Sequence, residues 1–145
     1  MAEVKYESKV SKATVQAAPI YAVLSDMRSL DKVRDLIPQD KVRDMEFEQD
    51  WARFKVDGLG QKITIRVVDR EENKTIKLMT ENSPMAITFW IQLKELASDD
   101  TRIKLTMSAD LPMMFRMMLE KKLKEGLDQA ADMLAQMPYE EWSKA

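Results

Sequence analysis

The 145-residue sequence contains neither cysteine nor histidine. The absence of cysteine excludes disulfides, thiol nucleophiles and thiolate metal sites, and it is typical of a reducing compartment. The absence of histidine excludes Ser-His-Asp and Cys-His catalysis, zinc sites built on these side chains and an imidazole pH switch. Any chemistry would therefore use Asp, Glu, Lys, Arg, Tyr, Ser or Thr. We expect no cofactor and no metal site.

Long apolar runs and an excess charge of one sign are also missing. No stretch approaches the ~18 uninterrupted apolar residues of a membrane-spanning helix. Residues 1–7 carry charges where a signal peptide has its apolar core. We therefore expect a cytoplasmic protein without integral membrane association. The 23 basic and 25 acidic residues leave a net charge of −2, so nucleic acid is not expected as a partner.

The composition that is present belongs to a folded chain. Hydrophobic residues make up 45% of the sequence and charged residues 33%, whereas a disordered chain would be poorer in large apolar side chains. No repeat, low-complexity tract or linker divides the chain. The length and composition predict one domain over residues 1–138, followed by a C-terminal tail at residues 139–145.

The first third of the sequence predicts a strand and two short helices. Val4 and Tyr6 alternate with charged residues, which indicates a strand ending near Ser11. Pro19 suits the first position of a helix because its φ is fixed, and apolar residues follow it at helical spacing. A second short helix is expected from a Ser29 cap to Pro38, because the residue before a proline disfavours α geometry.

The middle of the sequence predicts six more strands. Apolar and polar residues alternate around positions 45–47, 52–56, 63–67, 76–78, 87–93 and 103–107. Turn-forming residues separate several of them, at positions 57–60, 71–74 and 98–100. Consecutive hairpins of this kind indicate an antiparallel meander, seven strands in all with the first.

One long amphipathic helix is expected between Pro112 and Pro138. Its apolar positions recur every three to four residues, and about 25 residues at ~1.5 Å each would cross a small sheet. A glycine at position 126, inside the helix, lowers helix stability by about 1 kcal/mol relative to alanine. A close approach of the helix to the sheet would explain why a glycine is found there. The simplest interpretation of Lys121, Lys122 and Lys124 is that they lie on the solvent-exposed face of this helix. A contact with lipid headgroups is the alternative.

This order of elements resembles the helix-grip arrangement of the START-like (SRPBCC) superfamily, which includes polyketide cyclase/dehydrase-like and Bet v 1-like proteins. The segments 18–26 and 123–138 are similar to the family's first helix and its closing helix. The resemblance implies an α+β fold, with a seven-stranded curved antiparallel sheet, two short helices after strand 1, and a long C-terminal helix across the concave face. It also implies a small hydrophobic or amphipathic ligand, lipid-like or polyketide-like, bound between sheet and helix.

The expected ligand pocket combines inward-facing strand residues with the start of the long helix. These side chains are apolar, and methionines repack easily around variable guests. The same residue types would also fill a solid core, so a packed interior stays open as the alternative. The pocket residues are Phe47, Phe54, Ile65, Phe89, Ile91, Leu105, Met107, Met114, Phe115 and Met118.

Two further functions remain open. The first is a protein-interaction module, using Trp51 and Trp90 on the outer sheet face and an exposed patch at Met113 and Met117. The second is a cyclase-like enzyme, which would need a carboxylate whose pKa is moved by burial or by a neighbour. No spacing forces two such groups together, so we assign no catalytic residue. The candidates considered are Asp57, Arg66, Asp69, Glu81 and Asp110.

Overall fold

The computed structural model describes residues 3–36, 40–56, 61–81 and 86–143. The described residues form one antiparallel sheet of eight strands, in the order β1-β8-β7-β6-β5-β4-β3, with β2 also paired to β8. Six of the strands follow one another as a meander. The strands are β1 (Glu3–Glu7), β2 (Ser11–Ala13), β3 (Val42–Phe47), β4 (Trp51–Val56), β5 (Lys62–Glu71), β6 (Thr75–Glu81), β7 (Ile87–Ala97) and β8 (Asp100–Asp110).

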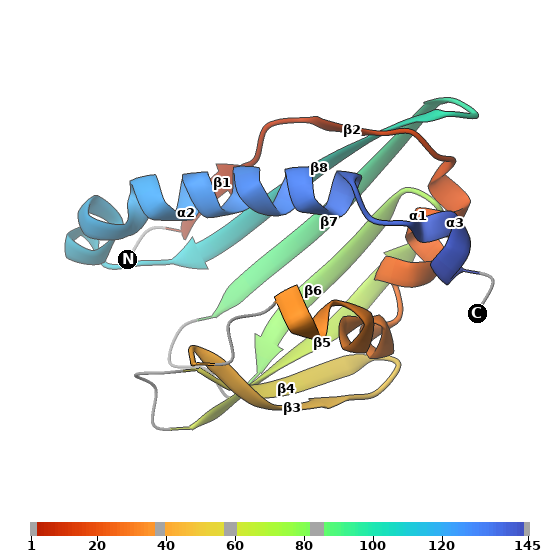
Figure 1. The fold of residues 1–145 in the computed structure, drawn as a ribbon. Helices are drawn as coiled ribbons and strands as arrows, with labels where there is room; N and C mark the ends of the chain where they lie inside the picture. The colour runs from red at the N-terminus through yellow and green to blue at the C-terminus, as the bar shows by residue number, and fades with distance from the viewer. Residues whose placement is uncertain (1–2, 37–39, 57–60, 82–85, 144–145) are drawn as a thin grey trace.

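The helices lie on one face of this sheet (Figure 1). Two short ones follow β2, namely α1 (Ala17–Leu24) and the 3-10 helix η1 (Met27–Leu36). The long helix α2 (Met113–Ala135) crosses the sheet along β1 and β8, and the single turn α3 (Tyr139–Trp142) follows it. The curved antiparallel sheet gripped by a long C-terminal helix confirms the predicted α+β helix-grip fold.

Strand alternation sorts the side chains into an apolar inner face and a polar outer face. Leu78, Phe89 and Met107 lie in register across β6, β7 and β8 on the inner face. Their neighbours Lys77 and Trp90 lie in register on the outer face. Each register is therefore determined by the apolar pattern, since a shift of one residue would turn the apolar side chains outward.

The N-terminal segment contributes two strands to the sheet where one was expected. Both β1 and β2 pair with β8, and the chain between them breaks the ladder. Ser8 spans this break, because its N–H donates to the Leu105 carbonyl and its hydroxyl accepts from the Leu105 N–H, each at 2.8 Å. The side chain of Ser8 thus replaces a ladder bond that the irregular backbone loses.

The α2 helix is attached to the N-terminal segment by polar contacts. The Lys9 N–H donates to Asp128 at 2.6 Å, and the Ser11 hydroxyl donates to Asp132 at 2.8 Å. The Lys9 ammonium also forms an ion pair with Asp132. The hydrogen bonds that the Asp132 carboxylate accepts from the Lys9 ammonium and the Ser11 hydroxyl hold its pKa below the usual value. Gly126 makes no close approach to the sheet, because a Cβ there would meet no atom within 4 Å.

Two turns show how loop residues shape the sheet. Asn73 adopts a positive φ of 60°, and the Lys74 N–H donates to the Glu71 carbonyl at 3.0 Å, which closes the expected turn at 71–74. Asp44, with a φ of 55°, lies where the β3–β4 register shifts, as in a β-bulge. The expected turn at 57–60 lies outside the described residues.

The C-terminal residues pack against the rest of the fold. Residues 139–142, expected within a tail, form α3, which contacts α1. Tyr139 is only 1% exposed, and its ring meets that of Trp142 edge-to-face, with centroids 6.3 Å apart. Burial of the Tyr139 ring therefore holds this short segment against the domain, where the sequence predicted a tail.

Candidate ligand-binding cavity

An apolar cavity of about 290 Å³ lies between the inner sheet face, η1 and α2. Strand residues form its floor, and their alternation explains why they all point inward. Ile65 pairs with Ala52, Phe89 with Leu78, and Ile91 with Leu105. The strand side chains on the inner face that line it are Ala52, Phe54, Ile65, Leu78, Phe89, Ile91 and Leu105.

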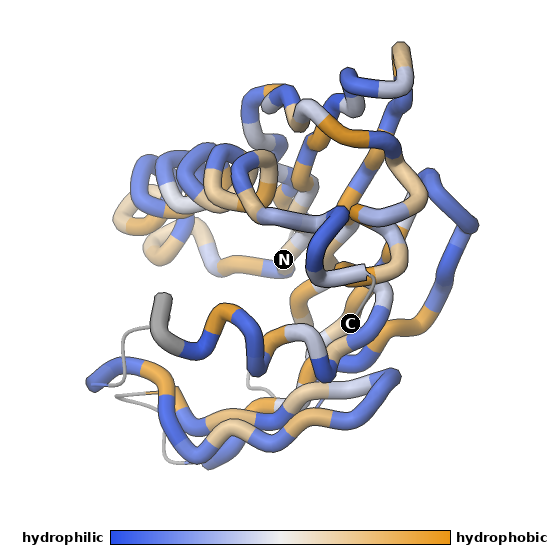
Figure 2. The backbone as a smooth tube through the Cα atoms, turned by 45° about the vertical axis from the view of Figure 1, so that its right-hand side comes forward, coloured by the Kyte–Doolittle hydropathy of each residue, from blue (hydrophilic) through white to orange (hydrophobic). Residues whose placement is uncertain are grey.

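The roof of the cavity comes from two helices. Met27 and Leu30 of η1 cover one side, and Leu127, Ala130 and Leu134 of α2 cover the other. The three α2 residues recur at intervals of three and four, so they share one helix face. Met27, Leu30 and Val33 recur every three residues, the period of a 3-10 helix, so they share one side of η1. Figure 2 shows the apolar positions of this segment separated by polar ones.

A smaller apolar hollow of about 70 Å³ adjoins the cavity. Met27, Leu30 and Leu134 line both spaces, so these three side chains form the wall between them. The hollow extends towards Trp142 and includes Asp26. Hydrogen bonds from Arg28, one of them at 2.6 Å, hold the pKa of the Asp26 carboxyl below its usual value. Asp26 is therefore an engaged carboxylate and a poor general base.

The cavity itself lacks an ionisable side chain among its described lining residues. Of the enzyme candidates, Arg66 and Glu81 form an ion pair at 2.6 Å, and both belong to the outer-face parity of their strands. Asp69 and Asp110 are exposed, and Asp57 lies outside the described residues. Over the described part of the chain, no group of three or more Asp or Glu residues could hold a metal ion.

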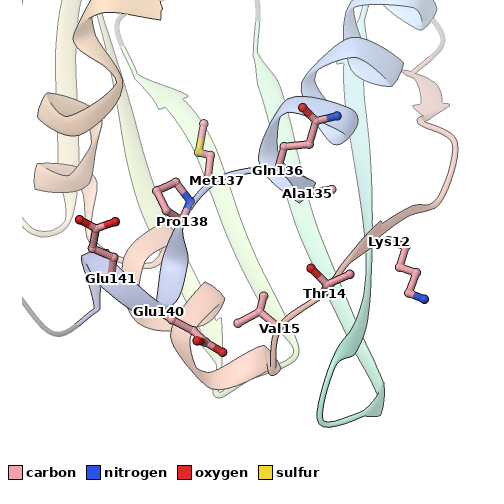
Figure 3. Close-up of a pocket in the computed structure, with 9 residues that line it drawn as sticks. All are labelled: Lys12, Thr14, Val15, Ala135, Gln136, Met137, Pro138, Glu140 and Glu141. Carbon is pink, nitrogen blue, oxygen red and sulfur yellow. The ribbon is translucent and has the colours of Figure 1, made fainter.

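A larger hollow of about 940 Å³ opens at the surface between the chain around β2 and the end of α2 (Figure 3). Its charged residues are Lys12, Glu140 and Glu141, and the figure shows their charged groups held apart from one another. Small-molecule sites are lined mainly by apolar side chains, and the few polar groups they contain converge on the ligand. This hollow has a mixed polar and apolar lining whose charged groups diverge, so it is a weaker candidate than the apolar cavity.

The structure brings together half of the side chains expected in the pocket. Phe54, Ile65, Phe89, Ile91 and Leu105 all line the cavity. Met107 is buried beside them in the core cluster that contains Leu127. Phe47 is half-buried at the edge of another cluster, with the Arg34 guanidinium 5.4 Å from its ring centroid.

The expected pocket residues of α2 lie away from the cavity. Met114, Phe115 and Met118 are 72%, 48% and 66% exposed. Met118 precedes Leu127 by nine residues, which at 3.6 residues per turn places it on about the opposite side of the helix. Leu127 faces the cavity, so Met118 faces solvent.

Seven of the lining residues described above were not among the pocket residues expected from the sequence, namely Met27, Leu30, Ala52, Leu78, Leu127, Ala130 and Leu134. The two alanines leave the space that larger side chains would fill, and Ala52 is the inward residue next to Phe54 on β4. The sequence feature that could have indicated a cavity at Ala52 was a small residue at an inward-facing strand position. Met27 and Leu30 could not be assigned from the sequence, because the position of η1 over the sheet depends on long-range packing.

The residues expected on a partner surface are all accessible. Met113 and Met117 are 70% and 79% exposed. Trp90 lies with its ring centroid 5.2 Å from the Lys5 ammonium and 5.7 Å from that of Lys77. Trp51 has the Arg53 guanidinium 4.9 Å from its ring centroid. These cation–π contacts occupy the rings and account for both tryptophans without a partner.

Comparison with known proteins defines the fold class. No protein-family model and no curated protein matches the sequence. Truncated norcoclaurine synthase from Thalictrum flavum is similar in structure, with a TM-score of 0.69 and 14% identity over 92% of this chain and 91% of that one. A START superfamily protein from Mycobacterium smegmatis has a TM-score of 0.57 and 15% identity over 89% of this chain and 96% of that one. A conserved protein from Geobacillus kaustophilus has a TM-score of 0.61 and 15% identity over 87% of each chain.

These similarities confirm that the protein has a START-like helix-grip fold. At identities of 15% or below, they define the fold and leave the ligand undefined. Among the described helices, none combines the length and apolar character needed to cross a bilayer.

Proposed function

We propose that the protein binds a small apolar or amphipathic molecule in the cavity between the sheet, η1 and α2. The supporting observation is a cavity of about 290 Å³ whose described lining side chains are almost all apolar. Filling such a space with a ligand removes apolar surface from water, at about 25 cal/mol per Å². With few polar groups to orient the guest, binding would be weakly selective.

The ligand class follows from the chemistry of the two adjoining spaces. None of the described residues that line the main cavity is charged, so an uncharged hydrocarbon part, lipid-like or polyketide-like, would occupy it. The smaller hollow adds Ser29 and the Asp26 carboxylate beside the shared wall. A polar end, such as a hydroxyl, would lie there rather than among the strand side chains. Binding in the cytoplasm, without catalysis, completes the proposal.

An enzymatic role has less support. A structure of norcoclaurine synthase from Thalictrum flavum contains dopamine and hydroxybenzaldehyde, and this chain shares its fold at 14% identity. A reaction on such substrates would need an acid or base within hydrogen-bond reach. The charged candidates described here lie on the outer face or at the surface, away from the cavity.

The test is binding of a neutral apolar dye, N-phenyl-1-naphthylamine, together with native mass spectrometry of gently purified protein. We expect the dye to bind with enhanced fluorescence and an apolar small molecule to co-purify. Ala130→Phe would fill the cavity and abolish dye binding. Gln129→Phe, at the neighbouring exposed position of α2, is the matched control and should leave it unchanged. Equal dye binding by both variants would contradict the cavity as the site.

A further inference from the structure

The N-terminal end of α2 carries an unusual concentration of exposed apolar side chains. Five of its first six residues are large apolar residues in solvent, and we call them the methionine tip. Their exposed fractions run from 48% to 79%, among the highest of the large apolar side chains described. The tip consists of Met113, Met114, Phe115, Met117 and Met118.

The tip is contiguous and therefore differs from scattered exposed apolar residues. A cluster of this kind on a monomer marks a contact site. Met114 and Met118 are one turn apart on the side of α2 opposite the cavity face. Their long unbranched side chains would adapt to a fluid partner at low cost, because methionine has several accessible rotamers.

Charge on α2 and the residues after it is distributed unevenly. Residues 113–125 contain four basic and two acidic side chains, a net charge of +2. Residues 126–143 contain four acidic side chains and no basic one, a net charge of −4. The helix dipole adds partial positive charge at the N-terminal end, where the first turn has no acidic residue. The apolar end is thus also the positive end.

Basic and apolar side chains share one side of the helix. Lys121 and Lys122 are exposed, and with Met114 and Met118 they fall within an arc of about 100°. Lys124 instead donates to the Glu7 carbonyl at 2.6 Å. The acidic residues Glu3 and Asp110 lie at the same end of the molecule, but on the outer face of the sheet, away from α2.

We propose that this end of α2 docks on an anionic lipid bilayer. The methionine tip would enter the boundary between headgroups and acyl chains, and Lys121 and Lys122 would contact anionic headgroups. The acidic C-terminal half of α2 would point away from the negative surface. A second copy of the chain is a poorer occupant, since two tips meeting head to head would bring like charges together.

The test is sedimentation of the full chain with vesicles of phosphatidylcholine alone, or of equal parts phosphatidylcholine and phosphatidylglycerol. We expect binding to the mixed vesicles and much weaker binding to the neutral ones. Raising the salt from about 0.1 M to about 1 M, where the screening length falls from about 10 Å to about 3 Å, should weaken binding to the mixed vesicles.

Variants separate the apolar from the electrostatic contribution. Met114→Glu with Met118→Glu should lower the partition coefficient at least about tenfold, the effect of losing one buried methionine side chain. Met133→Glu is the matched control, since Met133 is 43% exposed on the acidic half of the same helix. Lys121→Gln with Lys122→Gln should remove the preference for anionic vesicles. Circular dichroism would establish that all variants are folded.

Two results would overturn the proposal. One is vesicle binding that is absent, or that persists equally in the Met114→Glu, Met118→Glu variant. The other is concentration-dependent self-association in ultracentrifugation that this variant abolishes, which would assign the tip to a second copy. Dye binding in the cavity is a separate measurement, so the ligand proposal and the docking proposal can fail independently.

Discussion

At the scale of single residues, Gly126 is a weak point of α2 that nothing in the fold requires. It is exposed, and an added Cβ would meet no atom within 4 Å. Gly126→Ala should therefore raise the free energy of unfolding by about 1 kcal/mol, because alanine loses less backbone entropy in a helix. Urea denaturation measures the change. Gln129→Gly, at an exposed position one turn further on, should destabilise by a similar amount. A loss of stability in Gly126→Ala would mean that this part of α2 is not a regular helix.

Tyr139 should make the fold sensitive to alkali. Burial raises the pKa of its phenol above the usual value of 10.0. Above pH 10 the unfolded chain loses this proton while the folded protein keeps it, so stability is complete below pH 10 and falls as the pH rises beyond it, by up to about 1.4 kcal/mol per pH unit. Urea midpoints measured from pH 8 to pH 11 should therefore decline more steeply for the wild type than for Tyr139→Phe.

The Tyr139→Phe variant also tests what the buried Tyr139 hydroxyl contributes to stability. Among the described residues, the Tyr139 hydroxyl has no hydrogen-bond partner. Its removal in Tyr139→Phe should be neutral or stabilising at pH 7, since an unsatisfied buried polar group costs about 1–3 kcal/mol. Tyr139→Ala should instead destabilise by about 3–5 kcal/mol through the loss of packing. Parallel alkaline profiles for wild type and Tyr139→Phe would show that another group causes the pH dependence.

At the scale of elements, α2 has one face that holds the fold and another that does not. Leu127 is 8% exposed within the cluster beneath the helix, whereas Met117 is 79% exposed. Leu127→Ala should lower the free energy of unfolding by about 2–5 kcal/mol, and Met117→Ala should change it by less than about 0.5 kcal/mol. Thermal or urea unfolding distinguishes the two. Equal losses would mean that the methionine tip is buried against the protein.

The elements were predictable wherever a local pattern determines them. Alternation predicted the inward strand residues, and Phe54, Phe89 and Leu105 accordingly lie around one cavity. The split of the first strand was not predictable, because it depends on the pairing of Ser8 with Leu105, 97 positions away. The prediction that Met114 and Met118 line the pocket was wrong for another reason. Helical spacing identifies a face, but only the packing of Leu127 decides which face turns inward.

At the scale of the whole molecule, the fold leaves a space between the sheet and the helices that its core does not fill. Three clusters surround this space, under α2, under η1 and beside α1 and α3, and Ile91 packs against all three. The sequence could not distinguish a filled core from a cavity, since both use the same residue types. The difference depends on two small residues, Ala52 and Ala130, and on the distance at which η1 and α2 stand above the sheet.

That unfilled space should couple ligand binding to the stability of the entire fold. An apolar ligand that binds only the folded state stabilises it by about 2.7 kcal/mol at a free concentration of about 100 Kd. N-phenyl-1-naphthylamine near saturation should therefore raise the Tm of the wild type by several degrees. Ala130→Phe should start from a different Tm but show no shift with the dye, because its cavity is occupied by its own side chain. An equal shift in Ala130→Phe would place the dye elsewhere, with the methionine tip as the first surface to test.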